Sequence, residues 1–501
     1  MSLFVKKSLA QLQASADEGS TLKRTLGVGN LIALGIGAII GAGLFVRTAA
    51  AAGEHAGPAV TLSFIVAAVG CAFAGLCYAE FASIIPIAGS AYTYAYATMG
   101  EIIAWIIGWA LILEYALGAA TVSISWSEYL NKLMGGRIPY EWCHSPMESI
   151  AGHHGIMNVP ALIVLLLLSL LLIKGTQESA TVNTVIVVLK VAIVLVFIAV
   201  GWGFMKTGNH SPYVIPADAK PAVLANGTQY SYAPFFNHGW GGILAGAGVV
   251  FFAFIGFDAV STAAQEAKNP KKDMPIGILG SLVVCTILYI LFSYVLTGVA
   301  PYRDFMTQGK EASVAYAIST YMHMGWLASL VTVAILLGFS SVILVMLLGQ
   351  SRVFYTMSTD GLLPKIFSDL HPKFKTPYKS NLILFLFVGL FAAFLPESVA
   401  GDLTSIGTLF AFVLVCFGVM ILRKKDPNLE RPFKTPLVPL VPILGIIICG
   451  AMIVSLDRST QYAALAWMII GLVIYFSYSR KNSKLGSVGD ILPHAGEFDK
   501  K

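Results

Sequence analysis

Three charged residues lie deep inside long apolar stretches of the sequence: Lys190, Glu114 and Asp258. Lys190 stands within Val187–Ile193, where every other residue is apolar. A charged side chain at the centre of a bilayer costs at least about 2.5–3.5 kcal/mol, and apolar surroundings favour the neutral form of an amine. A lysine at this depth can therefore bind and release a proton under physiological conditions. We interpret Lys190 as a proton-coupling group, and a fixed ion pair with Glu114 or Asp258 is the alternative interpretation.

The acidic residues allow several roles. Glu114 could meet a cationic ligand, could serve as a counter-ion inside a helix bundle, or could be protonated and hydrogen-bonded; we favour the counter-ion or structural role. Asp258 is expected to cap a helix that begins beside Gly256. Glu80 and Glu101 lie nearer the ends of apolar stretches, so we expect their carboxylates to reach the membrane surface.

Glycines interrupt two of the apolar stretches. Gly35–Gly43 contains four glycines in nine residues, and each glycine costs a helix roughly 1 kcal/mol relative to alanine. Close helix packing through Gly37 and Gly41 is one explanation. We favour a break in mid-membrane, because Phe251–Asp258 carries a second interruption at Gly256. Paired broken helices expose backbone groups that can bind a ligand where water is scarce.

These exposed groups suit a zwitterion such as an amino acid. Amides at the start of a half-helix attract a carboxylate, and we assign this role to Gly41, Ala42 and Gly43. Carbonyls at and near the breaks suit an ammonium, with Phe252 and Phe254 as the expected walls. The predicted substrate-binding residues are Ile39, Ile40, Gly41, Ala42, Gly43, Phe252, Ala253, Phe254 and Ile255.

The elements that must position these residues are membrane-spanning helices. The chain has 501 residues, of which 57% are hydrophobic and 12% charged, whereas soluble domains carry roughly 25% charged residues. A span needs about 20 apolar residues. We predict an all-α polytopic membrane protein of about twelve transmembrane helices, at 28–52, 58–83, 101–130, 159–174, 181–205, 240–264, 274–300, 326–351, 381–396, 402–422, 441–456 and 460–479.

The basic residues orient these helices. With the N-terminus inside, 23 of the 32 Lys and Arg residues fall on the cytoplasmic side and eight outside, and the remaining one is Lys190. Positive charge marks the cytoplasmic side, so we expect both termini in the cytoplasm of a plasma-membrane protein. The alternating Tyr92, Tyr94 and Tyr96 are expected to anchor at the membrane interface, with a contribution to a gate as a second role.

The sequence argues against several other classes of protein. All nine histidines fall in loops or at span ends, without the spacing typical of metal ligands. A membrane-embedded enzyme would need such a cluster or a nucleophile–base pair at depth, and a channel would need a repeated selectivity element. We therefore predict no enzymatic activity, no metal, no cofactor and no nucleic-acid binding; a small membrane subunit is left open.

Several motifs resemble the amino acid–polyamine–organocation superfamily of transporters, over spans 1–10. They are Gly35–Phe45, Ile85–Tyr96, Phe251–Asp258 with Glu266–Pro270, and Gly108–Tyr115, the last of which is similar to the cationic amino acid transporter branch. The resemblance implies two inverted five-helix repeats (28–205 and 240–422) with helices 1 and 6 broken, then helices 11 and 12 (441–479), between cytoplasmic segments 1–27 and 480–501. It also implies that Lys190 replaces a sodium ion, near Ile36 and Ser340 or Ser341. Ala42 departs from a hydroxyl residue of some relatives, which removes one carboxylate donor.

The predicted function is secondary active transport of L-amino acids, as a proton symporter that works by alternating access. Exchange of one amino acid for another without obligatory proton coupling is the alternative. The resemblance implies cationic substrates, whereas Phe339 beside the predicted pocket keeps small neutral amino acids equally open.

Overall fold

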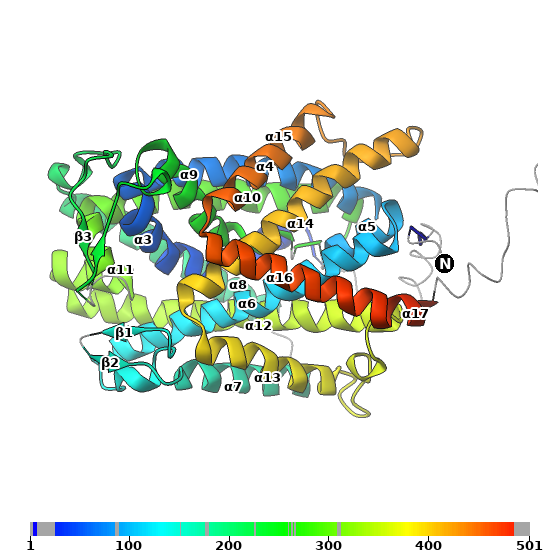
Figure 1. Cartoon of the computed structure of the whole chain (residues 1–501), viewed down its shortest axis with the longest axis horizontal. Coiled ribbons are helices and arrows are strands. Elements are labelled where there is room, and N and C mark those ends of the chain that lie inside the picture. The colour runs from blue at the N-terminus through cyan, green and yellow to red at the C-terminus, as the bar shows by residue number, and fades with distance from the viewer. Residues whose placement is uncertain are drawn as a thin grey trace, which may run out of the picture.

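The computed structural model describes residues 4–7, 26–85, 90–150, 152–175, 180–224, 227–258, 260–261, 264, 267–307 and 312–484. Long helices run side by side, and the N-terminal segment lies at the same end of the molecule as the last helix (Figure 1). Both terminal segments meet Glu101 there, because its amide donates to the carbonyl of Val5 and its carboxylate accepts from Ser483. Motif residues 86–89 and Glu266 fall outside the described part of the chain.

The helices follow the apolar stretches of the sequence. In chain order they are α2 (Val28–Ile39), α3 (Thr48–Ala51), α4 (Val60–Ile84), α5 (Ser90–Thr98), α6 (Glu101–Leu133), α7 (Val159–Lys174), α8 (Ala180–Gly201), α9 (Gly239–Val250), α10 (Pro270–Val299), α11 (Ser313–Tyr316), α12 (Gly325–Thr359), α13 (Tyr378–Phe394), α14 (Glu397–Lys425), α15 (Leu440–Ser455), α16 (Arg458–Ile474) and α17 (Arg480–Asn482). Short non-α turns join some of them, notably the π-helix Gly43–Arg47 and the 3₁₀-helix Phe251–Phe254. Two small hairpins lie in the loops: β1 (Ser149–Ile150) pairs with β2 (His153–His154), and β3 (Ala222–Val223) pairs with β4 (Gln229–Tyr230).

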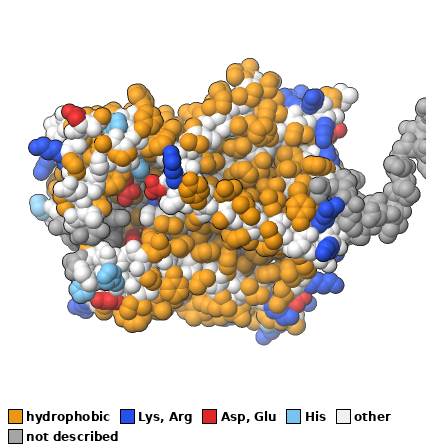
Figure 2. Space-filling view, in the orientation of Figure 1, with side chains coloured by type: hydrophobic (Ala, Val, Ile, Leu, Met, Phe, Trp, Pro, Cys, Tyr) orange, Lys and Arg blue, Asp and Glu red, His pale blue; other side chains and the backbone are white. Residues whose placement is uncertain are grey.

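Twelve apolar helices in the described part of the chain cover the predicted spans, and Gly43–Ile84 combines the second half of span 1 with span 2. Seven are long and apolar enough to cross a membrane: Gly43–Ile84, Glu101–Leu133, Thr184–Phe204, Pro270–Val299, Gly325–Thr359, Glu397–Lys425 and Arg458–Asn482. Five are shorter: Val28–Ile39, Val159–Lys174, Gly239–Phe254, Tyr378–Phe394 and Leu440–Ser455. Hydrophobic side chains cover the middle of the surface, and Lys and Arg gather toward its ends (Figure 2). The chain is an all-α polytopic membrane protein, as predicted.

The helix contacts support the prediction of two inverted five-helix repeats. Each helix of the first repeat has a counterpart in the second: α2 corresponds to α9, α4 to α10, α6 to α12, α7 to α13 and α8 to α14. The contact of α2 with α10 is matched by that of their counterparts α9 and α4, and the contact of α8 with α12 by that of α14 with α6. Counterparts also pack against each other in the pairs α4–α10, α6–α12 and α7–α13. The segment boundaries themselves stay a prediction.

The prediction that the tyrosines between spans 2 and 3 anchor at the membrane interface was wrong. Residues 90–98 form α5, and the side chains of Tyr92, Tyr94 and Tyr96 are buried. The hydroxyl of Tyr92 donates to Asp360 over 2.7 Å, and that of Tyr96 donates to Glu101 over 2.7 Å. Acceptors at the end of α12 and in α6 satisfy the hydroxyls of Tyr92 and Tyr96 inside the protein, a pairing that hydropathy does not reveal.

The prediction that Glu80 and Glu101 reach the membrane surface was also wrong, since both residues are buried. The side chain of Glu80 is fully buried and accepts two hydrogen bonds from Arg423, at 3.0 and 2.8 Å, and one from the amide of Thr435 at 2.7 Å. Arg431 lies 3.2 Å from its other oxygen. This cluster fastens the end of α4 to the end of α14 and the loop that follows.

We expect Glu80→Ala to destabilise the protein strongly. Removal of one partner from a buried ion pair costs about 3–5 kcal/mol, because the other charge is left buried. Thermal unfolding of the purified protein in detergent measures the effect. Asp369→Ala is the matched control, since Asp369 pairs with Lys379 at 2.7 Å with both side chains more than two-fifths exposed, and such pairs contribute about 0–1 kcal/mol. Equal melting temperatures for the two variants would contradict the assignment.

Candidate functional site

The first span breaks where the glycine pattern predicts. α2 ends at Ile39, Ile40 is extended with φ −73° and ψ 105°, and helical structure resumes beyond Gly41. The amide of Ile40 still donates to the carbonyl of Ile36 over 2.9 Å. In the described part of the chain, the amides of Gly41, Ala42 and Gly43 donate no hydrogen bond outside helical turns. The break therefore exposes amides on one side and the carbonyls at the end of α2 on the other.

The sixth span breaks at Gly256. The 3₁₀-helix Phe251–Phe254 follows α9, and Ile255 is extended with φ −60° and ψ 134°. Gly256 has φ +114°, a conformation that favours glycine. A Cβ at Gly256 would lie 2.9 Å from the carbonyl oxygen of Ala38, so this turn of the sixth span lies directly against the end of α2.

The two breaks touch each other through their backbones. A Cβ at Gly43 would lie 2.2 Å from the Cα of Ala253, a separation that no side chain can occupy. All nine predicted binding residues are buried. Val342 of α12 approaches to 3.3 Å from a Cβ at Gly41, and the rings of Phe45 and Phe339 lie 6.1 Å apart. The structure thus brings the predicted residues together in an enclosed, largely apolar region.

The ring of Phe254 packs against α4 and α10. It lies 6.2 Å from the ring of Phe64 in α4 and 5.3 Å from that of Tyr289 in α10. Phe254 therefore belongs to an aromatic layer between α4 and α10 that supports the second break.

Tyr289 is a polar residue of the site that sequence reasoning missed. Its hydroxyl lies 3.1 Å from the carbonyl oxygen of Ile39 and 2.9 Å from that of Ala253. A hydroxyl carries one proton, so it donates to one of these carbonyls at a time. Tyr289 joins the two breaks through carbonyls that the sequence assigned to the substrate ammonium. A tyrosine in the middle of an apolar span was the available signal.

Lys190 of α8 binds the end of α2. Its ammonium donates to the carbonyl of Gly37 over 2.7 Å, and its side chain is 1% exposed. The sequence pointed to Ile36, but that carbonyl already accepts from Ile40. The carbonyl of Gly37 would bond to the amide of Gly41 in a continuous helix, and the break frees it.

α12 supplies the other side of the Lys190 environment. A Cβ at Gly338 would meet the Cε of Lys190 at 3.0 Å. Of the two serines predicted here, Ser340 donates to the carbonyl of Leu336 in its own helix over 2.9 Å. Ser341 is buried, and its hydroxyl has no hydrogen-bond partner in the described part of the chain. The structure therefore leaves Ser341, rather than Ser340, with a hydroxyl available for a partner.

Glu114 and Asp258 are buried acidic residues beside Tyr115 of α6. Asp258 accepts a hydrogen bond from the hydroxyl of Tyr115 over 3.2 Å. Glu114 is 1% exposed, and within the described ranges neither of its oxygens is hydrogen-bonded to a lysine or arginine. The alternative ion pair between Lys190 and Glu114 is therefore not formed, and the counter-ion role predicted for Glu114 finds no basic partner.

Ion pairs lie on both sides of the breaks. Beyond the first break, the fully buried Arg47 pairs with Asp402 and, at 3.4 Å, with Glu397, both near the start of α14. At the end that carries the termini, Lys7 pairs with Asp360, the residue that also accepts from Tyr92. Arg47 is one of the eight basic residues expected outside, and its acidic partners could not be recognised from the sequence because they lie about 350 residues away.

Comparison with known proteins gives one consistent family. The family model described as "Amino acid permease" matches residues 26–477. The chain is 44% identical to "Branched-chain amino acid permease BcaP" of Bacillus subtilis (strain 168), over 97% of this chain and 99% of that protein. It is 40% identical to "Methylthioribose transporter" of the same organism, over the same shares. It is 36% identical to "Cationic amino acid transporter 4, vacuolar" of Arabidopsis thaliana, over 85% of this chain and 68% of that protein.

Proposed function

The chain belongs to the amino acid permease family, and from this premise we propose that it carries L-amino acids across the plasma membrane together with protons. The family model is described as "Amino acid permease", and relatives are named as branched-chain and cationic amino acid transporters. The direct contact of the two helix breaks is the main support for a central substrate site, because freed amides and carbonyls of both helices lie in one buried region.

The amino and carboxylate groups of the substrate bind to backbone groups at the breaks. The amides of Gly41, Ala42 and Gly43 receive the carboxylate, since they lie at the start of a half-helix. Carbonyls near Ile39 and Ala253 receive the ammonium, and Tyr289 holds these carbonyls in position when no substrate is bound. This polar end leaves the substrate side chain against apolar residues such as Val342.

Proton coupling rests on Lys190. Its ammonium holds the carbonyl of Gly37 at the end of the half-helix that precedes the substrate amides. In the protonated state this bond stabilises the outward, substrate-binding arrangement of the break. Loss of the proton removes the charge, weakens the bond and permits release on the inner side.

Alternating access uses the two sets of ion pairs. The pair of Arg47 with Asp402 would open toward one side and that of Lys7 with Asp360 toward the other. We assign the Lys7 end, where residues 4–7 and 480–484 lie, to the cytoplasm, because 23 basic residues belong to that side of the predicted topology and eight to the other.

A neutral, apolar amino acid fits the described surroundings best. Val342 and the rings of Phe45 and Phe339 lie near the breaks and offer an apolar surface to the substrate side chain. A thermal-shift screen of the purified protein against the twenty amino acids tests this proposal. We expect stabilisation by branched or small neutral L-amino acids and a weaker effect of lysine and arginine. Stronger stabilisation by lysine and arginine than by neutral amino acids would indicate cationic substrates. No stabilisation by any amino acid would contradict the proposed site.

We expect Tyr289→Phe to reduce uptake roughly two- to twelvefold, because a hydrogen bond contributes about 0.5–1.5 kcal/mol net. Radiolabelled uptake into proteoliposomes measures the effect. Tyr230→Phe is the control, since its hydroxyl also donates to a carbonyl, that of Glu54 at 2.7 Å, in the loop region. A Tyr289 variant as active as this control would show that the bridge between the breaks has no role in transport.

A further inference from the structure

A pocket of about 660 Å³ lies where the N-terminal segment crosses the ends of three helices. Lys6 and Lys7 line it from residues 4–7, and the remaining lining comes from the ends of α4, α5 and α14 and from the turn after α14. The full set is Lys6, Lys7, Ile84, Ile85, Ala97, Thr98, Leu422, Lys425, Asp426, Pro427, Asn428 and Leu429. The pocket lies at the ends of these helices and not at the helix breaks. Of its lining residues, Lys7 takes part in the proposed transport cycle through its pair with Asp360.

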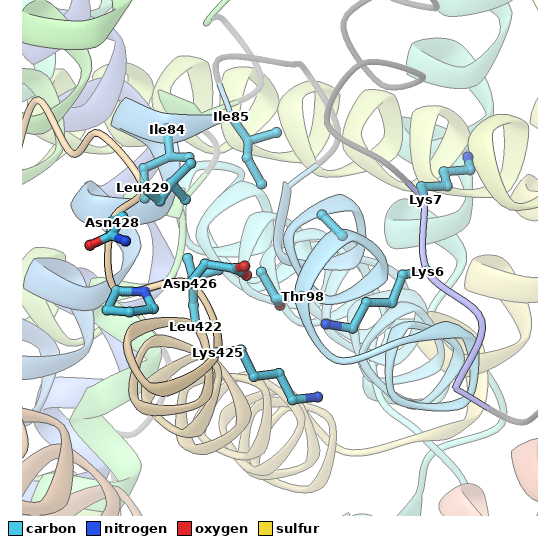
Figure 3. Close-up of a pocket in the computed structure, with 12 residues that line it drawn as sticks. Lys6, Lys7, Ile84, Ile85, Thr98, Leu422, Lys425, Asp426, Asn428 and Leu429 are labelled. Carbon is cyan, nitrogen blue, oxygen red and sulfur yellow. The ribbon is translucent and has the colours of Figure 1, made fainter. Parts of the chain in front are cut away.

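The polar side of this pocket carries an excess of positive charge. Lys6 and Lys425 reach toward each other, whereas the side chain of Lys7 points away (Figure 3) and is paired with Asp360. Burial and the charge of Lys425 lower the pKa of Lys6, and Asp426 acts in the opposite direction. The ammonium groups of Lys6 and Lys425 thus face only one carboxylate in the pocket lining, that of Asp426. An anion bound between the two ammonium groups would reduce their repulsion.

The opposite side of the pocket is apolar. Ile84 and Ile85 end α4, and Leu422 belongs to the last turn of α14. Both helices are membrane spans, so the pocket lies at the level of the bilayer surface, at the end where basic residues are concentrated. An anionic ligand in this position meets ammonium groups on one side and hydrocarbon on the other.

We propose that this pocket binds the phosphate group of an anionic phospholipid, with the lipid glycerol and upper acyl chains against the isoleucine and leucine side chains. The shared chemistry is a phosphate between two ammonium groups, which inorganic phosphate also offers. A phospholipid fits better, because it covers the apolar half of the pocket, and basic pockets at this level of a membrane are suited to such headgroups. The bound lipid fastens the N-terminal segment to α14.

Native mass spectrometry of the full-length protein, titrated with phosphatidylglycerol or phosphatidylcholine, tests the proposal. We expect phosphatidylglycerol to bind at least about tenfold more tightly. The double variant Lys6→Gln/Lys425→Gln is expected to lose roughly 30-fold in affinity for it, since each basic side chain near an anionic surface contributes about fivefold. Lys424→Gln is the control, because this exposed neighbour of Lys425 does not line the pocket. Lys425→Arg should retain binding.

Three results would overturn the proposal. Equal affinity for the two lipids would show that the charge of the lipid is not recognised. Unchanged binding by the double variant would show that the lipid does not bind in this pocket. The third is displacement of phosphatidylglycerol by inorganic phosphate at equal concentration, which would assign the pocket to a free anion. Comparison of the melting temperatures of wild type and double variant without lipid separates loss of the site from loss of the fold.

Discussion

Lys190→Met will reduce proton-driven uptake at least about tenfold, because a hydrogen bond from a charged group contributes about 1.5–3 kcal/mol. The variant removes the ammonium that donates to the carbonyl of Gly37 over 2.7 Å, while methionine retains much of the apolar volume beside Gly338. The outward arrangement of the break then loses its proton-dependent bond. Uptake into proteoliposomes at a series of external pH values, with a fixed internal pH, measures both the rate and its pH dependence.

Lys174→Met is the matched control for this experiment. Lys174 ends α7 and is exposed, so its replacement changes the same type of side chain outside the bundle. We expect wild-type pH dependence in the control and a flat profile in Lys190→Met. A Lys190 variant whose uptake still rises with external proton concentration, as in the wild type, would show that the proton binds elsewhere.

The second large effect is expected from Gly43→Ala. The added Cβ would lie 2.2 Å from the Cα and 2.5 Å from the amide nitrogen of Ala253. These are backbone atoms, so a change of rotamer cannot relieve the clash. Overpacking of a close-packed interior costs about 1–3 kcal/mol or more. The two breaks must then separate, and we expect uptake to fall by roughly one to two orders of magnitude, the factor that this free energy gives.

Gly29→Ala is the control for the second variant. Gly29 belongs to α2, and a Cβ there meets no heavy atom within 4 Å. Size-exclusion profiles in detergent establish that each variant is folded before uptake is measured. A folded Gly43→Ala protein with wild-type uptake would contradict the assignment of the substrate site to the contact between the breaks.

The spans and both breaks could be predicted from the sequence because their signals are local. Twenty apolar residues mark a helix wherever it packs, and the glycines at 41, 43 and 256 mark positions where the backbone of one helix approaches another. Lys190 was recognised for a similar reason, since its neighbours along the chain are all apolar. The acceptor of Lys190 is the carbonyl of Gly37, one residue after Ile36. The break frees this carbonyl because its helical partner, the amide of Gly41, lies beyond the break.

The polar contacts that brace the site could not be predicted in this way. Glu80 binds Arg423, and Arg47 binds Asp402, across more than 340 residues of sequence. Hydropathy ranks each of these side chains by its own position along a span, so Glu80 resembled a residue that reaches the surface. The partner that makes burial favourable comes from another helix. The same reason explains why the tyrosines of α5 resembled interface anchors.

The most direct test of the account is simultaneous measurement of substrate and proton movement in proteoliposomes that contain a pH-sensitive dye. With the membrane potential clamped, addition of a neutral L-amino acid that stabilises the purified protein should acidify the lumen in step with substrate uptake. Lys190→Met should lose the acidification. Saturable substrate uptake by the wild-type protein without acidification of the lumen would contradict proton-coupled transport.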